Sequence, residues 1–257
     1  MRSPSSTAPA SNPLMSRRTF ARALPFSVGA AGSVARATSS PSYMSEGKAI
    51  TVEWFPAATV APNSTAPALL LLHGADGTTY ADTYRLGASI LAGAGYHVAF
   101  PHYLDRTGDR RVSYGRLRQD YPVWVGTVRD GLGWLTNRRG VDAERLGIVG
   151  ISLGAALALS VAIKDHRARA IVGYSGPCPD ELVSADGSLP PTLILHGEDD
   201  RVVPVSNARR IVKLLGEKAA THEAHFYPDQ GHVFTGLARL DAAGRASAFL
   251  DRYLKAS

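Results

Sequence analysis

Ser152 stands at the centre of a G-x-S-x-G pattern over residues 150–154. A predicted strand over 145–149 precedes the pattern and an Ala/Leu-rich stretch over 153–163 follows it, so we predict a tight turn from a strand into a helix. The glycines let neighbouring backbone pass close by, and the turn presents the serine hydroxyl at a helix N-terminus. There the backbone N–H of Leu153 could face a developing oxyanion. The chemistry indicated is nucleophilic attack by Ser152.

A serine hydroxyl is a poor nucleophile unless a neighbouring base removes its proton. His232 follows a predicted strand over 222–227 and precedes the last predicted helix. Three acidic residues at 198–200 follow another short apolar strand, which places them at the carboxyl edge of the predicted sheet. Serine, then acid, then histidine is the order of the catalytic residues in α/β-hydrolases. We therefore predict a triad in which His232 is the base and one of these acids orients it.

Two further groups of residues are candidates for the site. The loop over 73–77 follows a buried strand and is rich in small residues, so we assign the second oxyanion donor to the backbone N–H of Ala75. Tyr103 and Arg106 follow the carboxyl end of the strand over 96–100, where pocket residues collect. We predict that they line the substrate pocket, with a local salt bridge as the alternative for this segment.

Predicted strands and helices alternate along the chain, and the candidate site residues lie at their ends. Predicted strands cover 50–55, 68–72, 96–100, 145–149, 170–174, 192–195 and 222–227, and predicted helices cover 79–93, 153–163, 206–215 and 237–254, with one or two more over 114–138. Strands separated by helical crossovers predict an α/β fold, a mostly parallel sheet with helices on both faces. The connection over 174–190 is too short for a helical cap domain. We expect one domain over 48–257.

Several short motifs together resemble the dienelactone-hydrolase-like branch of the α/β-hydrolase family. They are Leu72-His73-Gly74, residues 101–106 (Pro-His-Tyr-Leu-Asp-Arg), 150–154, 197–204 and 227–234, and the resemblance extends over about residues 68–248. It implies an α/β-hydrolase fold without a large cap. It also implies that the catalytic acid is Asp200, three residues before Val203, with Asp199 and Glu198 as the alternatives.

Two positions depart from that family. Dienelactone hydrolases use a cysteine where this chain has Ser152, and they carry an arginine four residues after the histidine, where Gly236 stands. A dienelactone is therefore not the expected substrate. We expect a serine hydrolase that cleaves small carboxylic esters through an acyl-enzyme and needs no cofactor or metal. The alternatives are a peptidase of the prolyl-oligopeptidase type and, from another functional class, a secreted binding protein on a hydrolase scaffold.

The charge of the chain is concentrated at its N-terminus. The formal net charge is +6, but residues 1–37 hold five arginines and no acidic residue, so the remainder is nearly neutral. A near-neutral body gives little electrostatic reason to bind nucleic acid or an anionic membrane. Ser16-Arg17-Arg18-Thr19-Phe20 resembles the bacterial twin-arginine export motif, and a mildly apolar run and small residues ending at Ala37 follow it. We expect residues 1–37 to be an export signal and the mature protein to be periplasmic or secreted.

Two other features of the sequence are assigned minor roles. Residues 38–47 are expected to be a flexible segment leading into the domain. Cys178 is the single cysteine, so it cannot form an intramolecular disulfide, and we expect it to be a packing residue.

Overall fold

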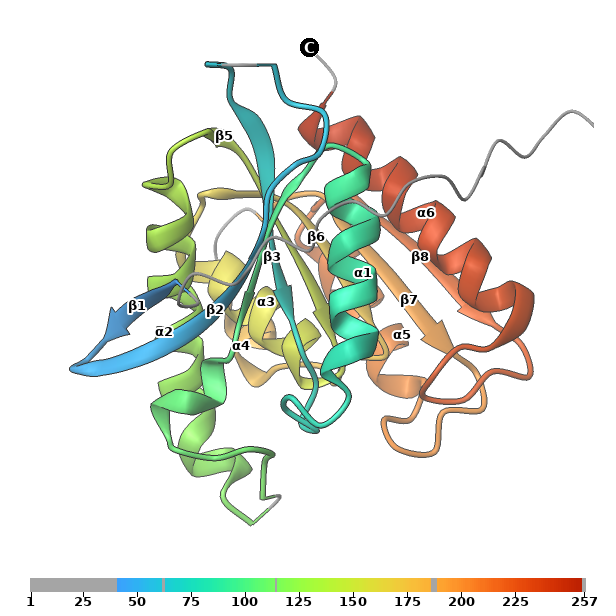
Figure 1. Ribbon diagram of the computed structural model, residues 1–257. Helices are drawn as coiled ribbons and strands as arrows, with labels where there is room; N and C mark the ends of the chain where they lie inside the picture. The colour runs from blue at the N-terminus through green and yellow to red at the C-terminus, as the bar shows by residue number, and fades with distance from the viewer. Residues whose placement is uncertain (1–40, 62, 114, 186–188, 256–257) are drawn as a thin grey trace, which may run out of the picture. The chain divides into compact units, whose positions relative to one another are not determined.

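A mixed β-sheet forms the centre of the protein (Figure 1). The computed structural model describes residues 41–61, 63–113, 115–185 and 189–255. The strands are β1 (Ser42–Ser45), β2 (Lys48–Phe55), β3 (Ala66–Leu72), β4 (His97–Pro101), β5 (Val141–Ile151), β6 (Ala168–Tyr174), β7 (Thr192–Gly197) and β8 (His222–Tyr227). Their order in the sheet is β1-β2-β4-β3-β5-β6-β7-β8. Strands β3 to β8 are parallel to one another, whereas β1 and β2 are antiparallel to their neighbours.

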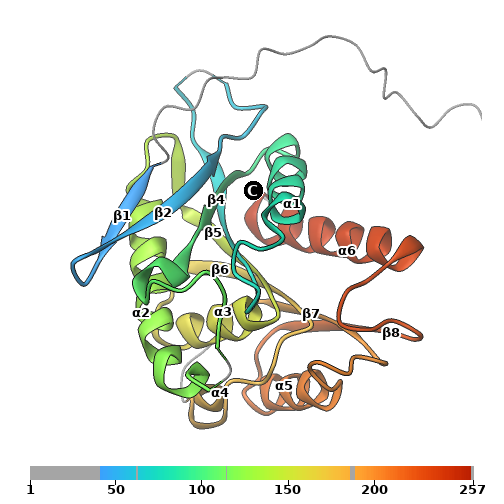
Figure 2. The same ribbon diagram turned by 60° about the horizontal axis from the view of Figure 1, so that its bottom comes forward.

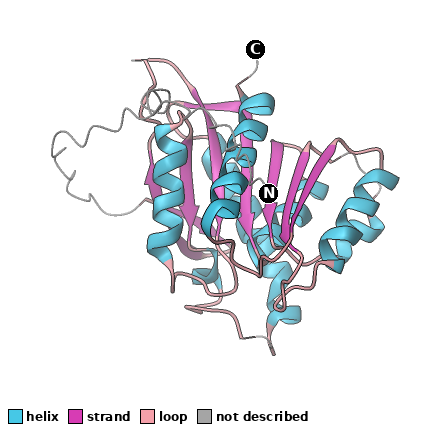
Figure 3. Ribbon diagram, turned by 90° about the vertical axis from the view of Figure 1, so that its right-hand side faces the viewer, coloured by secondary structure: helices cyan, strands magenta, loops and turns pink. Residues whose placement is uncertain are grey.

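Helices cover both faces of this sheet (Figures 2 and 3). One face packs against α1 (Ala81–Gly93) and α6 (Gly236–Leu254), and the other against α2 (Leu117–Thr136), α3 (Leu153–Lys164) and α5 (Ser206–Glu217). The described residues also form two short helices, the 3₁₀ helix η1 (Tyr103–Arg106) and the five-residue helix α4 (Asp180–Ser184). The predicted α/β-hydrolase fold without a large cap is confirmed. No helix within the described residues is both long and apolar enough to cross a bilayer.

Strand β3 shows why the apolar runs become central strands. All seven of its residues are buried. Its side chains alternate between the faces, so Leu69 and Leu71 join the core under α1 and α6, while Leu70 and Leu72 join the core under α2 and α3. A strand covered by helices on both faces must be apolar at every position.

The prediction of a flexible segment over residues 38–47 is wrong for its described part. Ser42–Ser45 form β1, which pairs with β2 through a turn at Glu46 and Gly47, both with positive φ. The hairpin is anchored because the buried hydroxyl of Tyr43 donates to the backbone oxygen of Thr127 at 2.9 Å in α2. The predicted export signal over 1–37 lies outside the described residues, as do residues 38–40.

Candidate active site

Ser152 occupies the predicted turn between β5 and α3, in a backbone conformation that only tight packing can hold. Its φ is 54° and its ψ is −118°, a region that residues other than glycine rarely adopt. The turn is tied down because the Ser152 N–H donates to the backbone oxygen of Tyr174 at 2.8 Å. A Cβ on Gly150 would lie 2.3 Å from the oxygen of Gly154, and a Cβ on Gly154 would lie 2.5 Å from the oxygen of Leu72. Both glycines of the pattern are therefore sterically required.

The three side chains predicted to form a triad come together at the carboxyl edge of the sheet. His232, in the loop after β8, has its Nε2 3.1 Å from the Ser152 hydroxyl oxygen. Its Nδ1 lies 2.8 Å from Oδ2 of Asp200, in the loop after β7. With the proton on Nδ1, Nε2 is free to accept the serine proton, so the arrangement can activate Ser152 as a nucleophile.

Burial distinguishes Asp200 from its two acidic neighbours. The Asp200 side chain is fully buried, and its second oxygen accepts the backbone N–H groups of Val202 and Val203 at 2.9 and 2.8 Å. Glu198 and Asp199 are exposed, and Glu198 pairs with an arginine of α5. The structure therefore brings Asp200, and neither alternative, to His232.

Close backbone packing sets the distance between the acid loop and the histidine loop. A Cβ on Gly197, the last residue of β7, would lie 2.2 Å from the backbone oxygen of Gln230 and 2.4 Å from that of Gly231. The N–H of Asp199 also donates to the oxygen of Gln230 at 3.0 Å. These contacts hold the two loops together, so the Asp200–His232 pair is preorganised.

A second histidine, His196, lies next to Asp200 and was not predicted from the sequence. The Nε2 of His196 donates to the oxygen of Val203 at 2.8 Å and lies 3.3 Å from Oδ2 of Asp200. Burial lowers the pKa of His196, so the ring stays neutral. Its position at the end of the predicted strand over 192–195 was the only available signal. The neutral ring packs against the buried Asp200 carboxylate.

The loop over 73–77 lies against the nucleophile, as the oxyanion assignment requires. A Cβ on Gly74 would lie 3.3 Å from the Cβ of Ser152, so the backbone here approaches the serine closely. Within the described parts of the chain, neither the Ala75 N–H nor the Leu153 N–H has a hydrogen-bond partner. The loop that carries the Ala75 N–H therefore lies against Ser152, and the assignment of Ala75 and Leu153 to the oxyanion hole stays a prediction.

The two residues predicted to line the substrate pocket do not reach the triad. Tyr103 is fully buried and stacks on His73 at 4.0 Å between ring centres, so its prediction as a pocket residue is wrong. Arg106 pairs with Glu46 in the β1–β2 turn, which is the local salt bridge considered as the alternative. Neither residue lines the nearby hollow of about 200 Å³, whose lining residues are His73, Gly77, Thr78, His102, Leu104, Asp105, Asp109 and Arg110.

No group of three or more His, Cys, Asp or Glu side chains among the described residues is suited to hold a metal ion. Cys178 is half-buried and free, and burial raises the pKa of its thiol. A thiol with a raised pKa is mostly protonated at neutral pH and is a weak nucleophile. Cys178 is therefore a poor candidate for a nucleophile.

Comparisons with known proteins agree with the fold. The sequence profile of the dienelactone hydrolase family matches residues 55–251. No curated protein sequence gives a significant match to the chain.

Among solved structures, the chain is similar to a protein assigned as a dienelactone hydrolase from Klebsiella pneumoniae, with a TM-score of 0.69 and 20% identity over 81% of this chain and 95% of that one. It is also similar to the esterase Est2 from Thermogutta terrifontis, with a TM-score of 0.64 and 17% identity over 83% of this chain and 92% of the esterase. The acylaminoacyl peptidase of Pyrococcus horikoshii gives a TM-score of 0.70 and 16% identity over 85% of this chain, but only 42% of the peptidase. These likenesses concern the fold.

Proposed function

The chain belongs to the dienelactone hydrolase family, and from this premise we propose that it is a serine hydrolase that cleaves carboxylic esters. The observation that carries the proposal is the continuous hydrogen-bond chain from Ser152 through His232 to Asp200. The similarity to the Est2 esterase and to the Klebsiella protein extends over nearly the whole of those chains. This full-length likeness favours an ester over a peptide substrate.

The proposed reaction has two steps. In the first, Ser152 Oγ attacks the ester carbonyl carbon while His232 Nε2 takes the hydroxyl proton and then passes it to the departing alcohol. Asp200 holds the imidazole in its tautomer and stabilises the cation that forms. The N–H groups of Leu153 and Ala75 bind the tetrahedral oxyanion, each donor being worth roughly 2.7–4 kcal/mol. In the second, water loses a proton to His232 and attacks the acyl-enzyme, which releases the acid.

The test uses the full-length protein and a series of p-nitrophenyl esters from acetate to long acyl chains. Wild-type turnover that is lost in Ser152→Ala supports a serine esterase, and the optimum chain length measures the acyl pocket. Ser160→Ala is the matched control because Ser160 is buried in α3, where it bonds Tyr121 at 2.8 Å. Equal activity in wild type and Ser152→Ala would refute the mechanism.

A serine peptidase is the second candidate, since peptide hydrolysis uses the same triad and oxyanion donors and the fold is shared with the Pyrococcus peptidase. The described residues between β6 and β7 contain only the short helix α4, so no large cap restricts access from that connection. Turnover of aminoacyl-p-nitroanilides with none of the ester series would favour the peptidase.

We also propose that the protein is exported to the periplasm or secreted by the twin-arginine route. The support is the order of Arg17-Arg18, the apolar run and the small residues ending at Ala37. Replacing both arginines with lysine should leave the uncleaved protein in the cytoplasm, as seen by fractionation and N-terminal sequencing. Unchanged export of this variant would exclude the route.

A further inference from the structure

The peptide unit between His73 and Gly74 is held on both edges by buried tyrosine hydroxyls. The hydroxyl of Tyr103, from η1, donates to the backbone oxygen of His73 at 2.9 Å. The N–H of Gly74 donates to the hydroxyl oxygen of Tyr84, from α1, at 3.0 Å. The carbonyl and N–H of a trans peptide point in opposite directions. The two rings therefore hold this unit from opposite sides.

The next peptide unit carries the Ala75 N–H, the donor assigned to the oxyanion hole. Its carbonyl, that of Gly74, accepts hydrogen bonds from Nδ1 of His73 at 2.8 Å and from the N–H of Gly77 at 3.1 Å. The Tyr103 hydroxyl also reaches this oxygen, at 3.4 Å. Of the four polar groups in these two units, the Ala75 N–H alone lacks a partner within the described residues. Hydrogen bonds to the carbonyl also polarise the amide and strengthen its N–H as a donor.

The side chains around the loop keep their protons over the working pH range. Burial raises the pKa of both Tyr84 and Tyr103, so their hydroxyls stay protonated. Burial lowers the pKa of His73 to about 3, so its imidazole stays neutral, with the proton on the nitrogen that bonds Gly74. The Tyr84 hydroxyl in turn donates to Oδ1 of Asp76 at 2.9 Å. The hydrogen bonds that hold the loop are therefore independent of pH near neutrality.

We propose that Tyr84 and Tyr103 are positioning residues of the oxyanion hole, an inference that rests on the proposed serine hydrolase mechanism. Neither hydroxyl touches the reacting atoms. Each fixes the peptide unit that precedes the donor and so sets where the Ala75 N–H points. Because an oxyanion donor acts only at about 2.7–3.1 Å from the oxyanion, a small rotation of this loop weakens transition-state binding more than substrate binding.

The test compares Tyr84→Phe and Tyr103→Phe in the full-length protein, since phenylalanine keeps the ring packing and removes only the hydroxyl. The matched control is Tyr43→Phe, which removes another buried hydroxyl that bonds a single backbone oxygen, that of Thr127, at the β1–β2 hairpin. The readouts are kcat and KM for p-nitrophenyl acetate, the thermal midpoint, and the rate of labelling by an alkyl fluorophosphonate. In labelling, Ser152 Oγ bonds to phosphorus, fluoride leaves, and His232 takes the serine proton.

The expected result is a decrease of about tenfold in both kcat and labelling rate for each tyrosine variant, with KM within about twofold. This is less than the loss of about 10²–10³ that follows deletion of a donor, because the N–H is displaced rather than removed. The double variant should lose less than the product of the two decreases, because both hydroxyls hold one peptide unit. Tyr43→Phe should lower the thermal midpoint and leave both rates unchanged.

Three results would overturn the inference: unchanged rates in both tyrosine variants, a change confined to KM, or equal rate losses in Tyr43→Phe. The two readouts also separate this inference from the proposed function. A wild-type protein that is labelled at Ser152 but hydrolyses no ester would refute the ester proposal, while the labelling rates of the variants would still decide the role of the tyrosines. A wild-type protein that is not labelled at all would refute both.

Discussion

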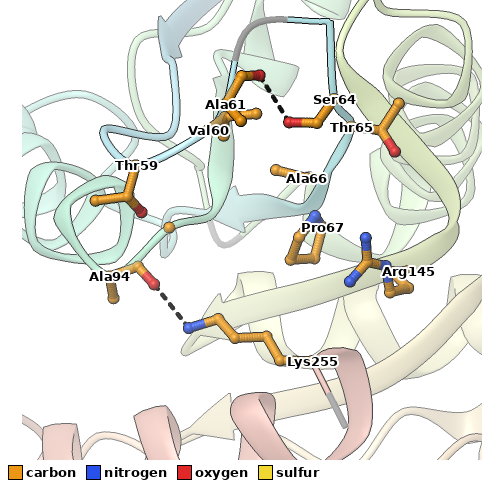
Figure 4. A pocket seen from close by; sticks show the side chains of 11 residues that line it. Thr59, Val60, Ala61, Ser64, Thr65, Ala66, Pro67, Ala94, Arg145 and Lys255 are labelled. Atoms are coloured by element: carbon orange, nitrogen blue, oxygen red, sulfur yellow. Dashed lines mark hydrogen bonds between the residues drawn. The ribbon is translucent and has the colours of Figure 1, made fainter. Parts of the chain in front are cut away.

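The two edges of the parallel strands offer contrasting surroundings. At the carboxyl edge, Ser152 sits in a strained backbone conformation, and the N–H groups of Leu153 and Ala75 have no partner among the described residues. At the amino edge, a hollow of about 360 Å³ lies between the start of β3, the end of α1 and the end of α6 (Figure 4). Its lining includes the cations Arg145 and Lys255. Arg145 pairs with Asp142 at 2.8 Å, and Lys255 pairs with Asp251 at 2.6 Å.

The difference shows that the size of a hollow does not mark a catalytic site. The charges at the amino edge are neutralised by neighbours on their own elements, and Lys255 also donates to the backbone oxygen of Ala94 at 2.7 Å. At the carboxyl edge, by contrast, the backbone of Ser152 is strained and two N–H donors have no partner among the described residues. Such features persist only because the surrounding packing fixes the backbone in this conformation. Four predictions test this contrast.

The largest expected effect is on kcat in Asp200→Asn, at the carboxyl edge. The amide would donate to Nδ1 of His232 and leave the imidazole in the wrong tautomer, so kcat should fall about 10⁴-fold, as in other triads. Asp199→Asn is the matched control, and its kcat should stay within about twofold because Asp199 is exposed. Steady-state kinetics with p-nitrophenyl acetate measure both. A larger loss in Asp199→Asn would assign the acid to that residue.

The second prediction concerns the packing that the carboxyl edge requires. Gly154→Ala would place a Cβ 2.5 and 2.6 Å from the backbone oxygens of Leu72 and His73, which cannot move aside. The free energy of unfolding should fall by about 3 kcal/mol or more. Gly244→Ala is the control, since nothing lies within 4 Å of its new Cβ in α6, and it should stabilise the helix by about 0.5–1 kcal/mol. Equal urea midpoints for the two variants would contradict the steric argument.

The third prediction concerns acid stability. His73 has a folded-state pKa of about 3, well below the ordinary value of about 6.5 in an unfolded chain. The unfolded state therefore binds more protons between these values, so stability is complete above about pH 6.5 and is lost as pH falls toward 3. The loss from this residue approaches about 1.4 kcal/mol per pH unit. When the free energy of unfolding is measured with urea from pH 7 to 4, it should fall less steeply with decreasing pH for His73→Gln than for wild type. Identical pH dependences in the two proteins would refute this prediction.

The smallest effect is expected at the amino edge. Lys255→Met removes a partly exposed ion pair with Asp251, which should cost no more than about 1 kcal/mol. The value of kcat should stay within about twofold of wild type, because the hollow there has no part in the proposed reaction. A tenfold loss of kcat without loss of stability would show that the amino edge contributes to function.

Much of the site could be predicted from the sequence because its parts are local. The G-x-S-x-G pattern specifies the turn at Ser152 through the steric demand of two glycines, and the pattern of apolar runs specifies the strands that end beside the acid and the histidine. The parallel sheet then brings these strand ends to one edge. The loop over 73–77 lies against Ser152 for the same reason.

The parts that were missed depend on residues distant in the chain. Strand β1 carries no apolar pattern of its own, and it forms because β2 pairs with it and Tyr43 reaches α2. Tyr103 was assigned to the pocket because it follows a strand, whereas its side chain turns inward to stack on His73.

The sequence by itself therefore determined the fold class, the turn that presents Ser152 and the chain order of Ser152, Asp200 and His232, since each is encoded by local periodicity or local sterics. Only the tertiary structure decided which of three adjacent acids is buried against His232. It also decided that Tyr84 and Tyr103 hold the peptide unit between His73 and Gly74. Burial and hydrogen-bond partners are properties of the packed chain, because they depend on which elements lie next to each other.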